Sequence, residues 1–151
     1  MNIKVIDRQS SLIIEESCVK ALVQATLDFQ NCCCDEVSVF FIDTEEMCQL
    51  HQQFFNDASP TDCISFPMDR QKEEDYWILG DVFVCPEVAI DNARDLGNDP
   101  YDETALYIVH GLLHLLGYDD MTEKDRKRIR LAERENLENF KRLGCSLKYK
   151  E

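Results

Sequence analysis

The residues of this chain whose types and spacing best suit chemistry are two histidines, His110 and His114, four positions apart in an apolar stretch. Leucine-rich surroundings predict a helix, on which residues four apart emerge on the same face, one turn from each other. That spacing lets both imidazoles reach a single tetrahedral ion at about 2.0–2.1 Å. The pattern indicates metal binding. The alternative is two ordinary histidines, buried or half-exposed, on an apolar helix.

A third ligand is expected in the loop after this helix. Gly117 can end the helix in a left-handed conformation, and the chain can then fold back. Asp120 lies six residues beyond His114, the spacing of the H-E-x-x-H-x-x-G-x-x-H pattern of metzincin proteases, which has histidine at that position. A carboxylate oxygen binds zinc at about 2.0–2.2 Å, so Asp120 is a competent replacement. Asp119 is the competing residue, although an aspartate after Gly-Tyr can instead satisfy loop amides.

Gly111 follows the first histidine, at the position where a zinc protease carries its general-base glutamate. Without that carboxylate, peptide hydrolysis lacks the group that takes the proton from water. A peptidase is therefore the least favoured enzyme class.

Periodicity and capping signals predict the elements that position these residues. Thr122 with Asp125, and Asp43 with Glu46, have the spacing of N-terminal capping pairs, and Asp99-Pro100 is typical of a helix start. We predict an α+β fold in one domain, residues 1–151, with the metal site on a helix and the loop after it. The four expected strands form a small mixed sheet and cover residues 2–7, 37–42, 63–66 and 79–85. Five helices are expected. The first is capped by Ser10 or Ser11 and runs to about residue 30, and the others cover 44–55, 86–96, 100–116 and 123 to about 143.

Composition excludes several classes of protein. With 151 residues and 44% hydrophobic residues, the chain can bury a core and is not a disordered protein. No run approaches the ~20 apolar residues of a membrane-spanning helix, and the N-terminus lacks the pattern of a secretory signal. The eight cysteines include no C-x-x-C pair. We expect them to be reduced thiols, with Cys63 and Cys85 in the core, in a cytoplasmic protein.

The charge is unevenly distributed along the chain. The formal net charge is -14, which opposes general binding of nucleic acid. Residues 124–130 nevertheless contain five basic residues in seven. This strip either guides a polyanion to one place or is a solvated helix face balanced by Glu133, Glu135 and Glu138.

Four ordered segments together resemble the YbeY family of bacterial metal-dependent endoribonucleases, and the resemblance covers most of the chain. The segments are the P-T-D-C-I-S-F-P run at 60–67, Leu-Gly-Asp-Val at 79–82, Asn92-Ala93, and the block from His110 to Asp120. The resemblance implies a small α+β fold with one zinc ion per chain, held by His110, His114 and residue 120. It also implies cleavage of single-stranded RNA, with roles in ribosomal RNA maturation and ribosome quality control on the small ribosomal subunit.

The chain departs from the family pattern at two positions. Asp120 replaces the third histidine, and Phe55 stands where the family usually has an arginine tied to activity. A phenylalanine cannot stabilise the charge of a phosphorane-like transition state.

Three hypotheses follow from the sequence. The first is a zinc-dependent endoribonuclease in which His114 and its companions hold the ion beside an activated water, with Asp62, Asp81 or Asp119 as the open choices of general base. The second is a ribosome-assembly binding module that keeps the metal for its structure and is catalytically weakened. The third is a peptidase. None predicts a membrane partner, and the sequence does not identify protein partners.

Overall fold

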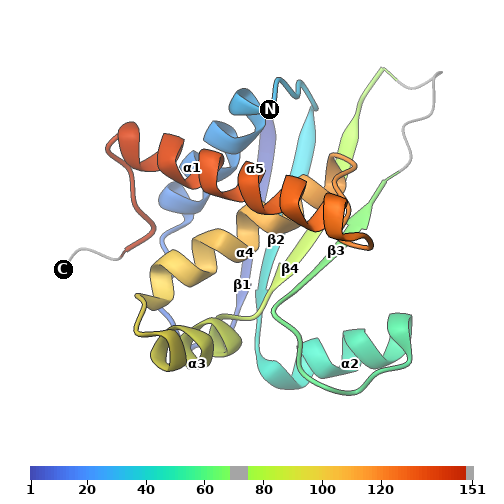
Figure 1. Cartoon of the computed structure of the whole chain (residues 1–151). Helices are drawn as coiled ribbons and strands as arrows, with labels where there is room; N and C mark the ends of the chain where they lie inside the picture. The colour runs from blue at the N-terminus through green and yellow to red at the C-terminus, as the bar shows by residue number, and fades with distance from the viewer. Residues whose placement is uncertain (69–74, 149–151) are drawn as a thin grey trace.

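The structure, a computed structural model, describes residues 1–68 and 75–148 and consists of helices packed on a mixed sheet (Figure 1). The sheet has the order β1-β2-β4-β3, in which β1, β2 and β4 are parallel and β3 is antiparallel to β4. The expected α+β architecture is confirmed. The strands are β1 (Asn2–Arg8), β2 (Glu36–Ile42), β3 (Cys63–Pro67) and β4 (Ile78–Val84), and the helices are α1 (Glu16–Phe29), α2 (Thr44–Phe55), α3 (Pro86–Leu96), α4 (Pro100–Leu115) and α5 (Glu123–Arg142).

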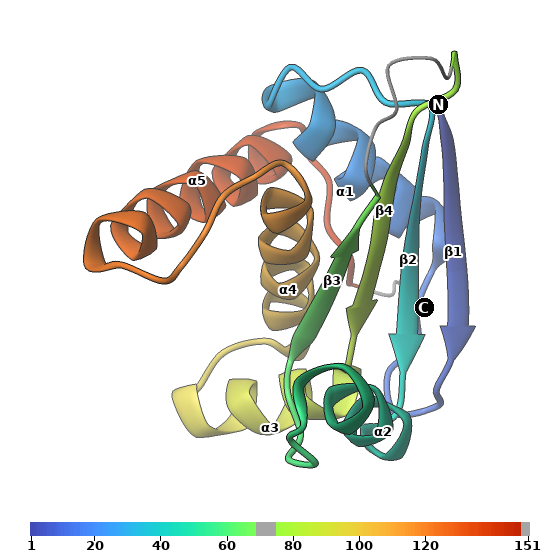
Figure 2. The ribbon, with the colours of Figure 1, turned by 90° about the vertical axis from the view of Figure 1, so that its right-hand side faces the viewer.

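Helices α1, α4 and α5 lie together on one face of the sheet (Figure 2). The alternation of side chains along the strands gives the sheet a core on each face. Val37, Val39 and Phe41 of β2 are fully buried in the main core, and the residues between them point to the opposite face. On that second face a smaller core gathers Ile42, Ile64 and Cys85 with Met47 of α2. The sheet is thus covered fully on one face and partly, by α2, on the other.

The predicted capping residues start three of the helices. Asp43 accepts the backbone N–H of Glu46 at 2.9 Å, Asp99 accepts that of Tyr101 at 2.7 Å, and Thr122 accepts that of Asp125 at 3.1 Å. Each bond satisfies an N–H that the first helical turn leaves without an intrahelical partner. These local signals place α2, α4 and α5 correctly.

The predicted start of α1 is wrong. The helix begins at Glu16, and Glu15, its N-cap, makes no side-chain capping bond. The Gln9 side chain instead accepts the N–H groups of Ser11 and Leu12 and donates to the Leu12 carbonyl. This side chain stabilises a turn where the two serines had suggested a helix.

Helix α4 approaches the sheet closely at Gly111. A Cβ placed on this glycine would lie 2.5 Å from Val82 Cγ1, 2.9 Å from Cys63 Sγ and 3.1 Å from Ser65 Oγ. Ser65 Oγ also donates a hydrogen bond to the Gly111 carbonyl at 3.0 Å. Glycine at this position is therefore required by helix-on-sheet packing, and a glutamate, as in a zinc protease, has no room here.

We expect Gly111→Ala to destabilise the protein by up to about 2 kcal/mol. Alanine improves helix propensity by about 1 kcal/mol, but overpacking a tight contact costs about 1–3 kcal/mol, and two of the three neighbours lie within 3.0 Å of the new Cβ. Urea unfolding of wild type, Gly111→Ala, Val82→Ala and the double variant measures this. The alanine should cost less in the Val82→Ala background; a stabilising Gly111→Ala would contradict the packing argument.

Candidate metal centre

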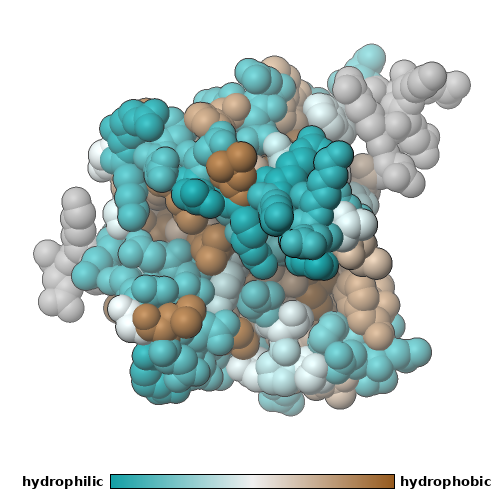
Figure 3. Space-filling view, viewed as in Figure 1, coloured by the Kyte–Doolittle hydropathy of each residue, from teal (hydrophilic) through white to brown (hydrophobic). Residues whose placement is uncertain are grey.

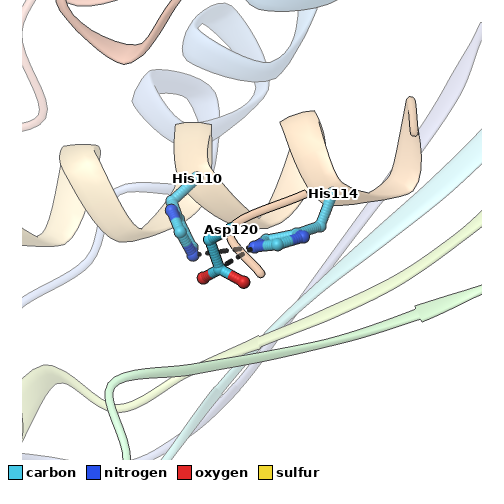
Figure 4. Close-up of side chains that lie close together, drawn as sticks. All are labelled: His110, His114 and Asp120. Atoms are coloured by element: carbon cyan, nitrogen blue, oxygen red, sulfur yellow. Dashed lines mark hydrogen bonds and ion pairs between the residues drawn. The ribbon is translucent and has the colours of Figure 1, made fainter. Parts of the chain in front are cut away.

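His110 and His114 project from α4 toward the same point, as their spacing predicts. Their Nε2 atoms are 3.0 Å apart, and their side chains are 20% and 26% exposed. Figure 4 shows the two rings converging from successive turns of the helix, on the side that faces the sheet.

Asp120 is the aspartate that reaches the histidines. Its Oδ2 lies 3.6 Å from His114 Nε2, and its side chain is 44% exposed. Asp119 turns elsewhere, because its Oδ1 accepts the backbone N–H of Asp120 at 2.8 Å. Gly117, with φ +98°, makes the turn that returns the chain, as expected.

The three donor groups fit a metal ion. One ligand atom from each of His110, His114 and Asp120 lies within 4.8 Å of the other two. Ligand atoms 2.0–2.1 Å from a tetrahedral ion are about 3.3 Å apart, and the observed separations of 3.0 Å (His110 Nε2 to His114 Nε2) and 3.6 Å (His114 Nε2 to Asp120 Oδ2) lie on either side of that value. Two imidazoles and one carboxylate can therefore hold an ion and leave a fourth position open.

The basic strip of α5, residues 124–130, contacts the loop of this site. Neither a polyanion guide nor a solvated helix face, the two interpretations of the strip, predicted these contacts. Arg126 Nη1 donates to the backbone carbonyls of Asp120 and Met121, at 3.2 and 3.4 Å. The Arg128 guanidinium lies 4.8 Å from the ring centroid of Tyr118, in the same loop. Two arginines of the strip thus hold the loop that carries Asp120.

Glu133 does not lie on the solvated face of α5. It is only 3% exposed, accepts a hydrogen bond from Nδ1 of His110 at 2.9 Å, and pairs with Arg130 at 2.7 Å. Burial raises the pKa of its carboxyl group, but the hydrogen bonds and charges of His110 and Arg130 lower it by more. The pKa of Glu133 is therefore below its ordinary value. Of the two interpretations of the basic strip, the solvated helix face does not hold at Glu133: this residue pairs with Arg130 of the strip, but α5 packs against α4 and turns it inward.

A cleft of about 480 Å³ opens beside the three donors. Its wall includes Phe55, the position at which the family resemblance implied an arginine; Phe55 is 56% exposed at the end of α2. His51, one turn earlier, also lines the cleft, with its ring centroid 5.7 Å from that of Phe55 and its Nδ1 2.8 Å from the Ser59 carbonyl oxygen. His51 was not among the predicted site residues, although its i, i+4 spacing from Phe55 places both on one helix face.

Asp62 also lines the cleft, at the entrance to β3, where its carbonyl accepts the backbone N–H of Cys85 at 3.1 Å. The neighbouring Cys63 is a poor ligand, because burial and the Asp62 carboxylate raise the pKa of its thiol well above the ordinary value. Of the two acids next to strands, Asp62 is the one that the structure brings to the site.

Asp81 is not brought to the cleft. Val82 points at Gly111 of α4, so the alternation of β4 turns Asp81 to the opposite face of the sheet. There burial raises the pKa of Asp81, and the nearby Glu36 carboxylate raises it further, against the opposing effects of Lys4 and a Ser38 hydrogen bond. A role for Asp81 as general base at the metal centre does not agree with this position.

Fold and donor set together define a small α+β protein with a candidate metal centre of the kind found in metal-dependent hydrolases. The family model described as Endoribonuclease YbeY matches residues 4–141, and the chain belongs to that family. This confirms the expected enzyme class, an endoribonuclease.

Individual relatives agree with this assignment. A Protochlamydia amoebophila protein named Endoribonuclease YbeY is 48% identical over 128 residues, covering 85% of each chain. A Chlamydia abortus protein of the same name is 38% identical, covering 91% of this chain and 89% of the relative. The solution structure of a Thermotoga maritima protein superposes with a TM-score of 0.63 at 26% identity, covering 91% of this chain and 87% of that one.

We expect Asp81→Asn to make the protein more stable at neutral pH. A carboxyl whose folded pKa is raised holds its proton more tightly when folded, so its contribution to stability falls as pH rises through that pKa. The advantage of the asparagine should therefore shrink as pH falls through that raised pKa and be gone below the ordinary aspartate value of about 3.9. Urea unfolding across pH 3–7 measures it, with exposed Asp95→Asn as the control. A variant less stable at pH 7 would contradict this prediction.

We also expect Asp120→Ala to lose most of the metal bound by the protein, because it removes one of three donor groups. Elemental mass spectrometry of untagged, zinc-loaded protein gives the metal content per chain. Asp119→Ala is the matched control, since its carboxylate serves the loop, and it should keep the metal. The reverse result would make Asp119 the ligand.

Proposed function

We propose that this chain is a zinc-dependent endoribonuclease that cleaves single-stranded RNA, with one ion held by His110, His114 and Asp120. The carrying observation is the convergence of these three donors, within 4.8 Å, on the cleft of a YbeY-family chain. Zinc is the favoured metal because two imidazoles and a carboxylate in a tetrahedral arrangement suit it, and three protein ligands leave the open position of a catalytic site.

The charge of the cleft supports dependence on a metal. Its described lining includes the carboxylates of Asp62 and Asp120 and no lysine or arginine. A phosphodiester is negatively charged, so this surface by itself repels the substrate. A bound ion would supply the missing positive charge and the Lewis acidity that polarises a phosphodiester oxygen and activates water near neutral pH.

We assign the proton-accepting role to Asp62. Among the acids that the sequence offered, it lines the cleft, whereas Asp119 is engaged in the loop and Asp81 faces the other side of the sheet. In this proposal the Asp62 carboxylate takes a proton from the attacking water. His51, whose Nδ1 lies 2.8 Å from the Ser59 carbonyl oxygen, adds a second polar side chain to the cleft wall.

The resemblance to the family extends the proposal to the substrate. We infer that the RNA is ribosomal, that the enzyme acts in maturation and quality control on the small ribosomal subunit, and that it works in the cytoplasm. A cleft of about 480 Å³ suits a short stretch of extended RNA strand, and single strands are the form of RNA whose bases are open to contact.

Within the described residues, none of the helices has the length and apolar character of a membrane span.

Phe55 favours a second candidate function, a ribosome-assembly module that binds RNA and retains the metal for its structure. An uncharged ring stands where the family usually has an arginine, and the net charge of -14 opposes nucleic-acid binding away from the cleft. On this proposal the ion stabilises the α4 loop, and RNA is bound without being cut.

We expect chelator-stripped protein to cleave a labelled single-stranded RNA only after zinc is restored, and His114→Ala to cut at least 100-fold more slowly, because it lacks a metal donor. The measurement is the initial rate of product formation on a denaturing gel, with a duplex of the same sequence as the poor substrate. Phe55→Arg should raise the rate about tenfold or more, since one added cationic donor can stabilise phosphoryl charge.

Two outcomes would contradict the enzymatic proposal. Cleavage by His114→Ala at the wild-type rate would mean that the activity does not depend on this site. Absence of zinc-restored cleavage in wild type, together with retained zinc and retained RNA binding, would support the binding module.

A further inference from the structure

Glu133 lies behind the metal centre and contacts it through one histidine only. Its carboxylate is buried, and Oε1 is 2.9 Å from His110 Nδ1. An ionised carboxylate can only accept hydrogen bonds, so the proton of this bond belongs to Nδ1 of His110. A neutral His110 therefore keeps the lone pair of its Nε2 free, and Nε2 is the atom that faces His114.

Arg130 holds Glu133 in place. From one turn earlier on α5 it donates to both carboxylate oxygens, Nη1 lying 2.7 Å from Oε1 and 2.9 Å from Oε2. A buried carboxylate without such partners is costly and tends to take up a proton. Paired with Arg130, Glu133 keeps its charge and a fixed orientation toward His110.

We propose that Glu133, held by Arg130, is a positioning residue of the metal centre that selects the Nδ1–H tautomer of His110 and aims its Nε2 lone pair at the ion. The inference rests on the proposed function only in requiring that His110 bind the metal. Partners of this kind fix the ring orientation of a ligand histidine and increase its basicity, and their loss typically costs 10–100-fold in metal affinity.

The first test is zinc affinity, measured by competition with a chromophoric chelator. Glu133→Ala should bind zinc about 10–100-fold more weakly than wild type. Glu133→Gln keeps the side-chain volume and an acceptor oxygen but loses the charge, and its affinity should fall between the two. Glu135→Gln makes the same change on the exposed side of α5 and should bind like wild type.

The second test separates positioning from a purely structural role. Long-range ¹H–¹⁵N correlation spectra of the zinc-free proteins report which imidazole nitrogen of His110 carries the proton. Wild type should show the Nδ1–H tautomer, and Glu133→Ala should show a mixture, in samples whose circular dichroism and unfolding temperature show an intact fold. Arg130→Gln is a second variant, and it leaves the core intact because the Arg130 side chain is 60% exposed. It should lose less zinc affinity than Glu133→Ala.

The results that overturn the inference differ from those that overturn the proposed function. Equal zinc affinity in wild type and Glu133→Ala, or an Nε2–H His110 in wild type, would overturn the positioning role while leaving a zinc-dependent nuclease intact. A wild-type protein that binds no zinc would overturn the proposed metal dependence and this inference together.

Discussion

The contact of α4 with the sheet at Gly111 is the constraint on which the rest of the site depends. The absence of a Cβ lets the helix approach β3 and β4 until Val82, Cys63 and Ser65 fill the space. His110 and His114 lie on the same helix as this glycine and line the cleft together with Cys63 and Ser65. Gly111, at the position where a zinc protease has its glutamate, is therefore also the residue that allows the histidine-bearing helix to pack this closely on the strands.

Helix α5 provides the second layer of support. Its basic segment contacts the site at three points: Arg126 on the loop carbonyls, Arg128 on Tyr118, and Arg130 through Glu133 on His110. The hydrophilic side chains of α5 cover the centre of the face seen in Figure 3, where hydrophobic groups form only small separate patches. Arginines that look from the sequence like a surface strip thus act inward as well, because a guanidinium can bridge to carbonyls and rings while it stays partly in water.

The charges that line the cleft are negative, as is the RNA backbone that an endoribonuclease binds. Asp62 and Asp120 border a cleft without a described lysine or arginine, in a chain of net charge -14. Phe55, where the resemblance to the family implied an arginine, lines the same cleft and adds no positive charge. A metal ion at the His-His-Asp group would offset both these carboxylates and the charge of a phosphodiester.

Local physical rules allowed the sequence by itself to predict most elements and the principal donors. Capping by Asp43, Asp99 and Thr122 depends on neighbouring backbone groups, and the pairing of His110 with His114 depends only on the helical period. The same rules failed at the start of α1, where the Gln9 side chain competes for the backbone amides. Tertiary structure alone decided that Glu133, 23 residues away, meets His110, that His51 and Phe55 share the cleft, and that Asp81 faces the opposite side of the sheet. These outcomes depend on how helices pack on each other and on which face of a strand meets them, and no spacing within one segment carries that information.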